Sequence, residues 1–327
     1  MFRFAGSSPP RRDLLSRRDL LAGAAALALP SAAGCRCAGG PTASSTIGDG
    51  APPSAQPAVA PPWHELSFDP SPIYAEQERA LVLVPEGAAA LPVVVALHGR
   101  GETRSLDIGA RGFRDFYGLD RIDGRLRAPP ITRDDLLGFT NDERLSHINA
   151  SLAAAPYRGV VLACPYAPDL RDRSFAGAEP FGRFVTEVLL PKAREEAGAP
   201  ASPERTGIDG VSMGGRLALW IGLRFPEAFG AIGAMQPALK ANEAGEVARL
   251  AASARSRNAK LRIRLLSSEG DPFLDAVKAT SEAMRALSVA HDLVVVPGPH
   301  NYDWNRGPGC AEMLLWQERA LRGLPSP

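Results

Sequence analysis

Short apolar runs alternate with longer helical stretches along residues 63–327. Seven apolar runs predict strands, at residues 80–84, 93–97, 160–164, 206–210, 231–235, 261–266 and 293–296. Four longer segments between them predict helices, at residues 181–197, 214–225, 243–256 and 275–288. Several strand runs are apolar at nearly every position, which is typical of parallel strands buried on both faces. The alternation therefore predicts an α/β fold with a mostly parallel central sheet flanked by helices.

One long segment, residues 102–159, departs from this alternation. It is polar, rich in arginine and only weakly periodic, and it lies between two predicted strands. An insertion of this length within a compact domain often carries function. Two interpretations remain open: helices that decorate the fold with solvated arginines, which the composition favours, and a lid that shapes the substrate pocket.

The first 35 residues have the pattern of an export signal. Arg17 and Arg18 precede an apolar run at residues 20–29, which is followed by a zone of small residues. The run is too short to cross a membrane, because a spanning helix needs about 20 apolar residues. A basic region, a short apolar region and a small-residue cleavage zone are typical of a signal peptide. The arginine pair resembles the twin-arginine type, which exports folded proteins.

Cys35 follows Ala-Ala-Gly at the end of this signal, a pattern that resembles a lipoprotein box. Two interpretations remain open: lipidation of Cys35, which would anchor the chain in the cell envelope, and simple cleavage to a periplasmic or secreted form. Residues 36–62 are rich in proline, alanine and serine, which is typical of a flexible tether. A lipid at Cys35 would be the chain's only predicted contact with a membrane.

The charge balance argues against a nucleic-acid partner. The chain has 37 basic and 36 acidic residues, and residues 63–327 contain 31 and 33 of them. Binding to nucleic acid needs a basic face that displaces counterions from the phosphates. The four cysteines and five histidines show no zinc-ligand spacing, so no metal is expected. We expect Cys164 and Cys310 to be two unpaired thiols, with a disulfide between them as the alternative.

The sharpest motif is Gly-Val-Ser-Met-Gly at residues 210–214. It lies between the predicted strand at 206–210 and the predicted helix at 214–225. In a sharp strand-to-helix turn, glycines on either side of the serine avoid collisions, and the serine hydroxyl projects at the mouth of the sheet. This context makes Ser212 a candidate nucleophile.

A serine needs a histidine to take its proton and an acid to orient that histidine. His300 is the best candidate base, because it follows the last predicted strand in a loop rich in glycine and proline. Asp271 is the preferred acid in the loop after strand 261–266, and Glu269 and Asp275 are the alternatives. The chain order serine, aspartate, histidine is that of α/β-hydrolases.

The oxyanion of a tetrahedral intermediate needs two backbone N–H donors. One is expected from Met213, directly after the serine. The other is expected from the loop after strand 93–97, where we favour the N–H of Arg100 over that of Gly101. His98 in this loop is expected to shape it, whereas the Arg100 side chain is expected to face solvent or, as the alternative, to contact an anionic substrate.

Residues 80–320 resemble the α/β-hydrolase superfamily, and within it an esterase group that includes S-formylglutathione hydrolases, feruloyl esterases and secreted mycolyltransferases. Four segments carry the resemblance: Leu97-His98-Gly99, Gly210-Val211-Ser212-Met213-Gly214-Gly215, Gly270-Asp271-Pro272-Phe273-Leu274 and Gly298-Pro299-His300-Asn301-Tyr302-Asp303-Trp304. The resemblance implies an α/β-hydrolase fold and supports Asp271 as the acid. The insertion at 102–159 and Arg100 depart from the group's pattern and border the pocket, so the resemblance does not imply a substrate.

Together these patterns predict an exported serine hydrolase, whose catalytic domain at residues 63–327 cleaves carboxylic esters through an acyl-enzyme without a cofactor. The expected substrate is a small-molecule or carbohydrate ester. Two alternatives remain open: an acyltransferase that uses the same three residues, and a non-catalytic binding lipoprotein of the cell envelope built on a hydrolase fold.

Overall fold

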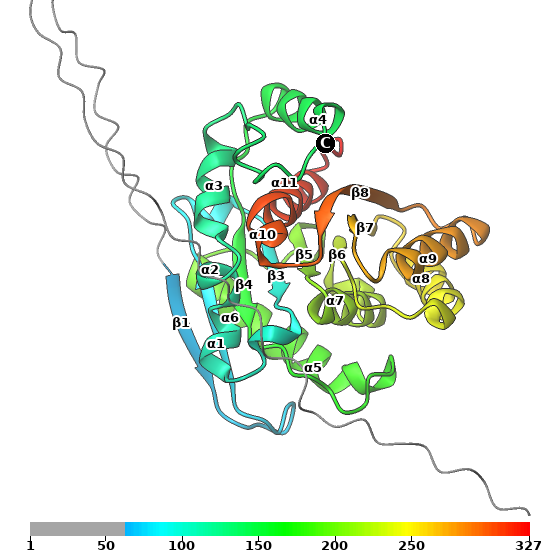
Figure 1. Cartoon of the computed structure of the whole chain (residues 1–327). Coiled ribbons are helices and arrows are strands. Elements are labelled where there is room, and N and C mark those ends of the chain that lie inside the picture. The colour runs from blue at the N-terminus through cyan, green and yellow to red at the C-terminus, as the bar shows by residue number, and fades with distance from the viewer. Residues whose placement is uncertain (1–62) are drawn as a thin grey trace, which may run out of the picture. The chain divides into compact units, whose positions relative to one another are not determined.

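The computed structural model describes residues 63–327, which are built on one eight-stranded sheet (Figure 1). The strands are β1 (Trp63–Phe68), β2 (Glu78–Leu83), β3 (Val93–Leu97), β4 (Val161–Pro165), β5 (Thr206–Gly210), β6 (Ala231–Met235), β7 (Arg262–Gly270) and β8 (Asp292–Pro299). Their order across the sheet is β1-β2-β4-β3-β5-β6-β7-β8. β1 pairs antiparallel with β2, and β2 antiparallel with β4, whereas every pair from β4 to β8 is parallel. The predicted α/β fold with a mostly parallel sheet is confirmed.

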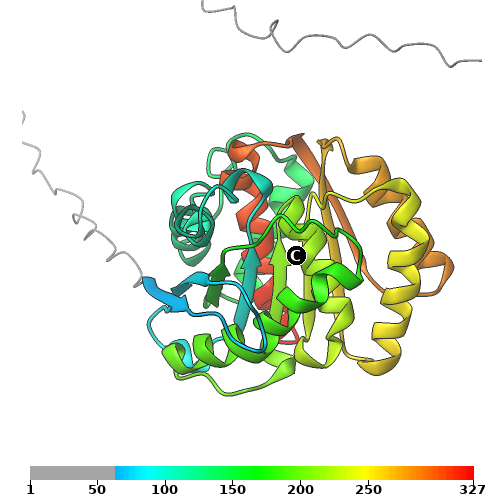
Figure 2. The same cartoon turned by 90° about the horizontal axis from the view of Figure 1, so that it is seen from below.

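Helices cover both faces of the sheet (Figure 2). They are α1 (Leu106–Ala110), α2 (Gly112–Asp115), α3 (Leu119–Arg127), α4 (Asp142–Ala154), α5 (Glu179–Phe184), α6 (Leu190–Ala197), α7 (Met213–Arg224), α8 (Ala244–Arg257), α9 (Leu274–Ala286), α10 (Tyr302–Trp304) and α11 (Cys310–Leu321). A π-helical segment, Val185–Leu189, joins α5 to α6. Helices α5 to α9 pack on one face, and α3, α4 and α11 pack on the other.

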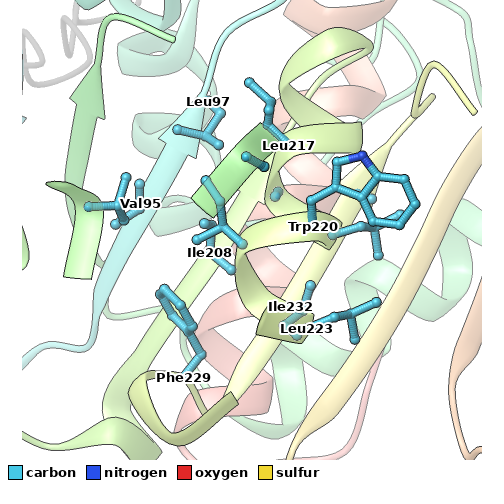
Figure 3. Packing of buried hydrophobic residues seen from close by; sticks show 14 of the residues in the cluster. Val95, Leu97, Ile208, Leu217, Trp220, Leu223, Phe229 and Ile232 are labelled. Carbon is cyan, nitrogen blue, oxygen red and sulfur yellow. The ribbon is translucent and has the colours of Figure 1, made fainter. Parts of the chain in front are cut away.

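The central strands are apolar throughout because both of their faces are buried. In β3, Val95 and Leu97 join the core beneath α7, whereas Val94 and Ala96 join the core on the opposite face. Figure 3 shows the first of these cores, where residues of β3, β5 and β6 meet the apolar side of α7 around Trp220. Burying one Val or Leu side chain contributes about 1.5–3 kcal/mol, so these strands anchor the loops that follow them.

Two elements carried no clear signal in the sequence. β1 alternates half-buried and exposed residues at the edge of the sheet, where a strand has only one neighbour. In α11, nearly every residue from Cys310 to Leu321 is buried. A helix that is covered on all sides lacks the polar stripe by which an amphipathic helix is found.

The insertion at 102–159 folds into α1 to α4 and packs on the sheet. Phe113, Leu119 and Ile122 are fully buried in the core that α11 shares. Several of its arginines pair with carboxylates: Arg125 with Asp135 at 2.9 Å, for example. The structure therefore agrees with the interpretation of this segment as helices that decorate the fold. It differs in that several of the arginines pair with carboxylates and are not simply solvated. Mobility of this segment as a lid stays a prediction.

The predicted export signal at 1–35, with Cys35, and the tether at 36–62 lie outside the described residues. Within residues 63–327, no helix combines the length and the apolar character needed for a membrane span.

Candidate active site

The turn between β5 and α7 raises Ser212 at the carboxyl edge of the sheet. Ser212 has φ 58° and ψ −114°, a conformation that costs free energy and persists only where the surroundings impose it. Its N–H donates to Met235 O in β6 at 2.9 Å, so the neighbouring strand holds the turn in place. A Cβ at Gly210 would lie 2.5 Å from the backbone of Gly214, and a Cβ at Gly214 would collide with Leu97 O. Both glycines are thus required by close packing.

The structure brings Ser212, His300 and Asp271 together. His300 Nε2 lies 3.1 Å from Ser212 Oγ, and His300 Nδ1 lies 3.0 Å from Asp271 Oδ1. Because a carboxylate oxygen only accepts, Nδ1 carries the proton and Nε2 is left free to accept the proton of the serine. β7 and β8 extend beyond their predicted ends, so that Asp271 and His300 directly follow them.

The carboxylate of Asp271 is fully buried and held by three donors. Besides His300, the Ser267 hydroxyl donates to Oδ2 at 2.6 Å, and the Phe273 N–H donates to Oδ1 at 3.0 Å. These bonds compensate the loss of water around a buried charge. The alternatives Glu269 and Asp275 are exposed to solvent, and only Asp271 meets the histidine. The contact of Ser267 with Asp271 was not predicted from the sequence.

His98 ties two loops together behind the candidate oxyanion site. It is fully buried, its Nδ1 lies 2.7 Å from Gly99 O, and its Nε2 accepts from Ala167 N–H at 2.8 Å. Burial lowers the pKa of His98, which keeps the ring neutral and its Nε2 able to accept. The expectation that His98 shapes this loop agrees with these contacts.

Arg100 begins a short 3-10 turn, and Met213 begins α7. The first N–H groups of a helix have no acceptor within that helix, so both residues can present an N–H to a ligand. The Arg100 side chain is 65% exposed, and its Nη2 forms an ion pair with Asp169 at 2.8 Å. The solvent-facing expectation for this side chain thus agrees with the structure, with the addition of a protein partner.

Glu102 links the candidate oxyanion loop to two tyrosines. Its buried carboxylate accepts from the Tyr117 hydroxyl at 2.6 Å and from the Tyr302 hydroxyl at 2.5 Å. Tyr117 in turn accepts from the Gly99 N–H at 2.9 Å. Burial and the bond to Glu102 raise the pKa of Tyr302 to about 12, so the phenol keeps its proton. The three side chains join the loop after β3 to the insertion and to the histidine loop.

A cavity of about 190 Å³ lies beside the serine and histidine. The loop at 99–102, the two tyrosines, Asn301 and Asn305 form its walls, together with Val211, Ser212 and His300. It has room for a small group of an ester, and its walls are largely polar in residue type. No role was predicted for Glu102, Tyr117, Tyr302 or Asn305 from the sequence. Tyr302 and Asn305 follow His300 closely, which was the only sequence signal available.

The other histidines lie away from Ser212. His291 contacts Ser281 Oγ at 2.7 Å and Val289 O at 2.8 Å, His64 in β1 contacts Glu196, and His147 is exposed on α4. Cys164 and Cys310 are buried free thiols, as expected. Burial raises the pKa of both thiols, which keeps them protonated and unreactive.

Comparisons with known proteins agree with this geometry. Residues 151–306 match the model of a family described as "Putative esterase", and this segment contains Ser212, Asp271 and His300. No curated protein matches the chain by sequence.

Several solved esterases share the fold. A ferulic acid esterase superposes with a TM-score of 0.59 at 15% identity, over 80% of this chain and 98% of that one. A ferulic acid esterase from the fungus Anaeromyces mucronatus has a TM-score of 0.52 at 18% identity, over 78% and 90%. S-formylglutathione hydrolase from Staphylococcus aureus has a TM-score of 0.50 at 11% identity, over 79% and 97%.

The fold and the family match together define the class: the chain has the α/β-hydrolase fold, and the match of residues 151–306 to an esterase family supports a carboxylic ester hydrolase. The solved structures that share this fold include feruloyl esterases and an S-formylglutathione hydrolase.

Proposed function

We propose that this protein hydrolyses a small-molecule or carbohydrate ester through an acyl-enzyme formed on Ser212. The observation that carries the proposal is the continuous pair of hydrogen bonds from Ser212 Oγ through His300 to Asp271. A serine hydroxyl is a weak nucleophile until a base removes its proton, and this arrangement supplies that base.

Each proton in the proposed reaction has a defined path. Ser212 Oγ attacks the ester carbonyl while its proton moves to His300 Nε2, and the imidazolium then gives that proton to the departing alcohol. A water molecule next loses a proton to His300 and attacks the acyl-enzyme, which releases the acid and restores Ser212. The Asp271 carboxylate stabilises the imidazolium in both halves of the reaction.

Two backbone N–H groups are proposed to stabilise the oxyanion. Met213 donates from the start of α7, where the helix dipole also favours negative charge. Arg100 donates from the loop that His98, Tyr117 and Glu102 hold. Because neither donor is a side chain, we test this part of the proposal through the contacts that hold the loop.

A fluorophosphonate probe tests the nucleophile. The folded wild-type protein should be labelled and Ser212→Ala should not, and His300→Ala should lose both labelling and turnover. A folded wild-type protein that takes no label would contradict the proposal and favour a non-catalytic role. Analysis of products with water and an added sugar or alcohol separates hydrolysis, which releases free acid, from acyl transfer.

We also propose that the protein is exported and anchored through Cys35. The support is the arginine pair, the short apolar run and the small residues before Cys35. Detergent partitioning of cell extracts tests this: the wild type should enter the detergent phase, and Cys35→Ser should enter the aqueous phase. Equal partitioning of the two proteins would contradict a lipid anchor, and wild type retained in the cytoplasm would contradict export.

A further inference from the structure

The cavity beside Ser212 contains one polar side chain whose hydrogen-bonding capacity is unused. Asn305 is only 8% exposed, and its Oδ1 is buried without a partner. Among residues 63–327, its side-chain amide takes part in no hydrogen bond. A buried polar atom without a partner is costly in a folded protein unless water or a ligand satisfies it.

The neighbouring Asn301 shows how an ordinary asparagine is satisfied in this segment. Its Oδ1 accepts from the Trp304 N–H at 3.0 Å and caps the short helix α10. Asn305 has no comparable structural task, although it lines the same cavity. Its placement therefore points to a group that enters the cavity.

Tyr302 defines which kind of group would fit. Its hydroxyl proton is committed to Glu102 Oε1 at 2.5 Å, so its oxygen can offer only lone pairs to the cavity. The raised pKa of Tyr302 keeps this polarity at neutral pH. The amide of Asn305 offers both a donor and an acceptor. A hydroxyl group, which also donates and accepts, complements both side chains.

We infer that Asn305 and Tyr302 form a subsite that binds a hydroxyl group of the ester substrate beside the scissile carbonyl. The preferred substrates are then esters of a hydroxy acid or of a polyol. This inference rests on the proposed function, because it assigns part of the substrate to the cavity next to Ser212. A site built to hydrogen-bond a hydroxyl discriminates strongly against an analogue that lacks it, since its own polar groups are left unpaired.

Two pairs of esters, each differing by hydroxyl against methyl, test the subsite. Ethyl 3-hydroxybutyrate and ethyl 3-methylbutyrate place the group on the acid side. 2-Hydroxyethyl butyrate and propyl butyrate place it on the alcohol side. The ratio of kcat/KM within each pair is measured for the wild type and for Asn305→Leu. Dividing the two ratios cancels the intrinsic reactivity of the esters.

In one of the two pairs, the preference for the hydroxylated ester should fall by about 10-fold or more in Asn305→Leu. The pair that responds identifies the side of the ester that occupies the cavity. Tyr302→Phe, which removes one acceptor, should lower the same preference by a smaller factor. Asn242 is an exposed asparagine just before α8. The same change there, Asn242→Leu, should leave both ratios unchanged.

Ratios that stay within about twofold in both pairs would overturn the subsite, provided that the esters are hydrolysed. If the leucine variant does not fold, Asn305→Ala gives the same comparison, because it removes the amide without adding volume. A wild-type protein that neither hydrolyses these esters nor reacts with fluorophosphonate would instead refute the proposed function. The two failures are therefore distinct.

Discussion

Two buried aspartates near the serine turn have opposite surroundings. Asp271, after β7, faces a histidine that borders the cavity, and its other contacts are a hydroxyl and an N–H. Asp209, in β5, faces Arg264, with Nη2 at 3.6 Å from Oδ2, and accepts from Gln317 Nε2 at 3.1 Å. Both carboxylates are fully buried, so burial alone does not distinguish a candidate catalytic acid from a structural one. The partner distinguishes them: Asp271 faces a histidine, which can gain and lose a proton, whereas Asp209 faces an arginine, which stays a cation.

Asp209 belongs to a network of buried charged side chains between the sheet and helix α11. Arg264 is fully buried, donates to Glu312 O at 2.8 Å and lies 4.7 Å from the ring centre of Trp316. Glu312 also pairs with Arg144 of the insertion. Burial raises the pKa of Asp209 and lowers that of Arg264, while each partner opposes the shift of the other. The network joins β5, β7, α11 and α4 rather than serving a ligand.

The largest effect is expected from Asp271→Asn. An amide in place of the carboxylate stabilises the wrong tautomer of His300 and cannot compensate the imidazolium, so kcat should fall on the order of 10⁴-fold. Single-turnover kinetics with a chromogenic ester measures the loss, and urea unfolding should show a much smaller change in stability. If kcat of this variant stays within about tenfold of the wild-type value, another residue must be the acid.

The same substitution at the other aspartate should act on stability. Asp209→Asn removes one anion from a fully buried guanidinium, and breaking a buried pair costs about 3–5 kcal/mol. Urea unfolding at pH 7 measures this loss. Labelling of Ser212, normalised to folded protein, should remain close to wild type. A loss of labelling without a loss of stability would show that Asp209 acts on the site.

An intermediate effect is expected at Glu102, which is buried like Asp209 but faces the cavity. Glu102→Gln leaves one tyrosine hydroxyl without its acceptor and loosens the loop that carries Arg100. We expect kcat to fall about 10-fold with little change in KM, because the loop acts on the oxyanion rather than on substrate binding. On esters that lack a hydroxyl group, Tyr302→Phe is the matched comparison, because it removes one of the two bonds to Glu102. A rise in KM alone would make Glu102 a binding residue.

The smallest effect is a pH dependence of stability through His98. Burial lowers its pKa in the folded state below the ordinary value of 6.5, so its contribution is present above pH 6.5 and is lost as the pH falls below it. The slope is at most about 1.4 kcal/mol per pH unit. Urea unfolding at pH 7.5 and 5.5, in the wild type and in His98→Asn, isolates this histidine. Equal pH dependence in both proteins would exclude it as the source.

The candidate nucleophile, acid and base could be predicted because each directly follows a strand. The carboxyl ends of parallel strands meet at one edge of a sheet, so Ser212, Asp271 and His300 converge once the strands are recognised. The choice between Asp271 and its neighbours Glu269 and Asp275 rested on a motif, and the structure shows the physical reason. Only Asp271 lies where a serine hydroxyl and an N–H replace the water lost on burial.

Other parts of the site depend on contacts that no local pattern encodes. Glu102 lies 200 positions from Tyr302 along the chain, and Asp209 lies 108 from Gln317. The insertion that supplies Tyr117 has weak periodicity, so its packing could not be read from its residues. The order of polar and apolar residues along the chain was enough to predict the sheet and its main flanking helices, because strands buried on both faces are apolar at nearly every position. The three candidate site residues could then be found at the ends of those strands. Only the tertiary structure showed that Asp209 faces a cation, that Glu102 accepts from two tyrosines, and that Asn305 Oδ1 has no partner in the cavity beside Ser212. The physical reason is that hydrogen-bond partners are groups close in space, and these groups are far apart in the sequence.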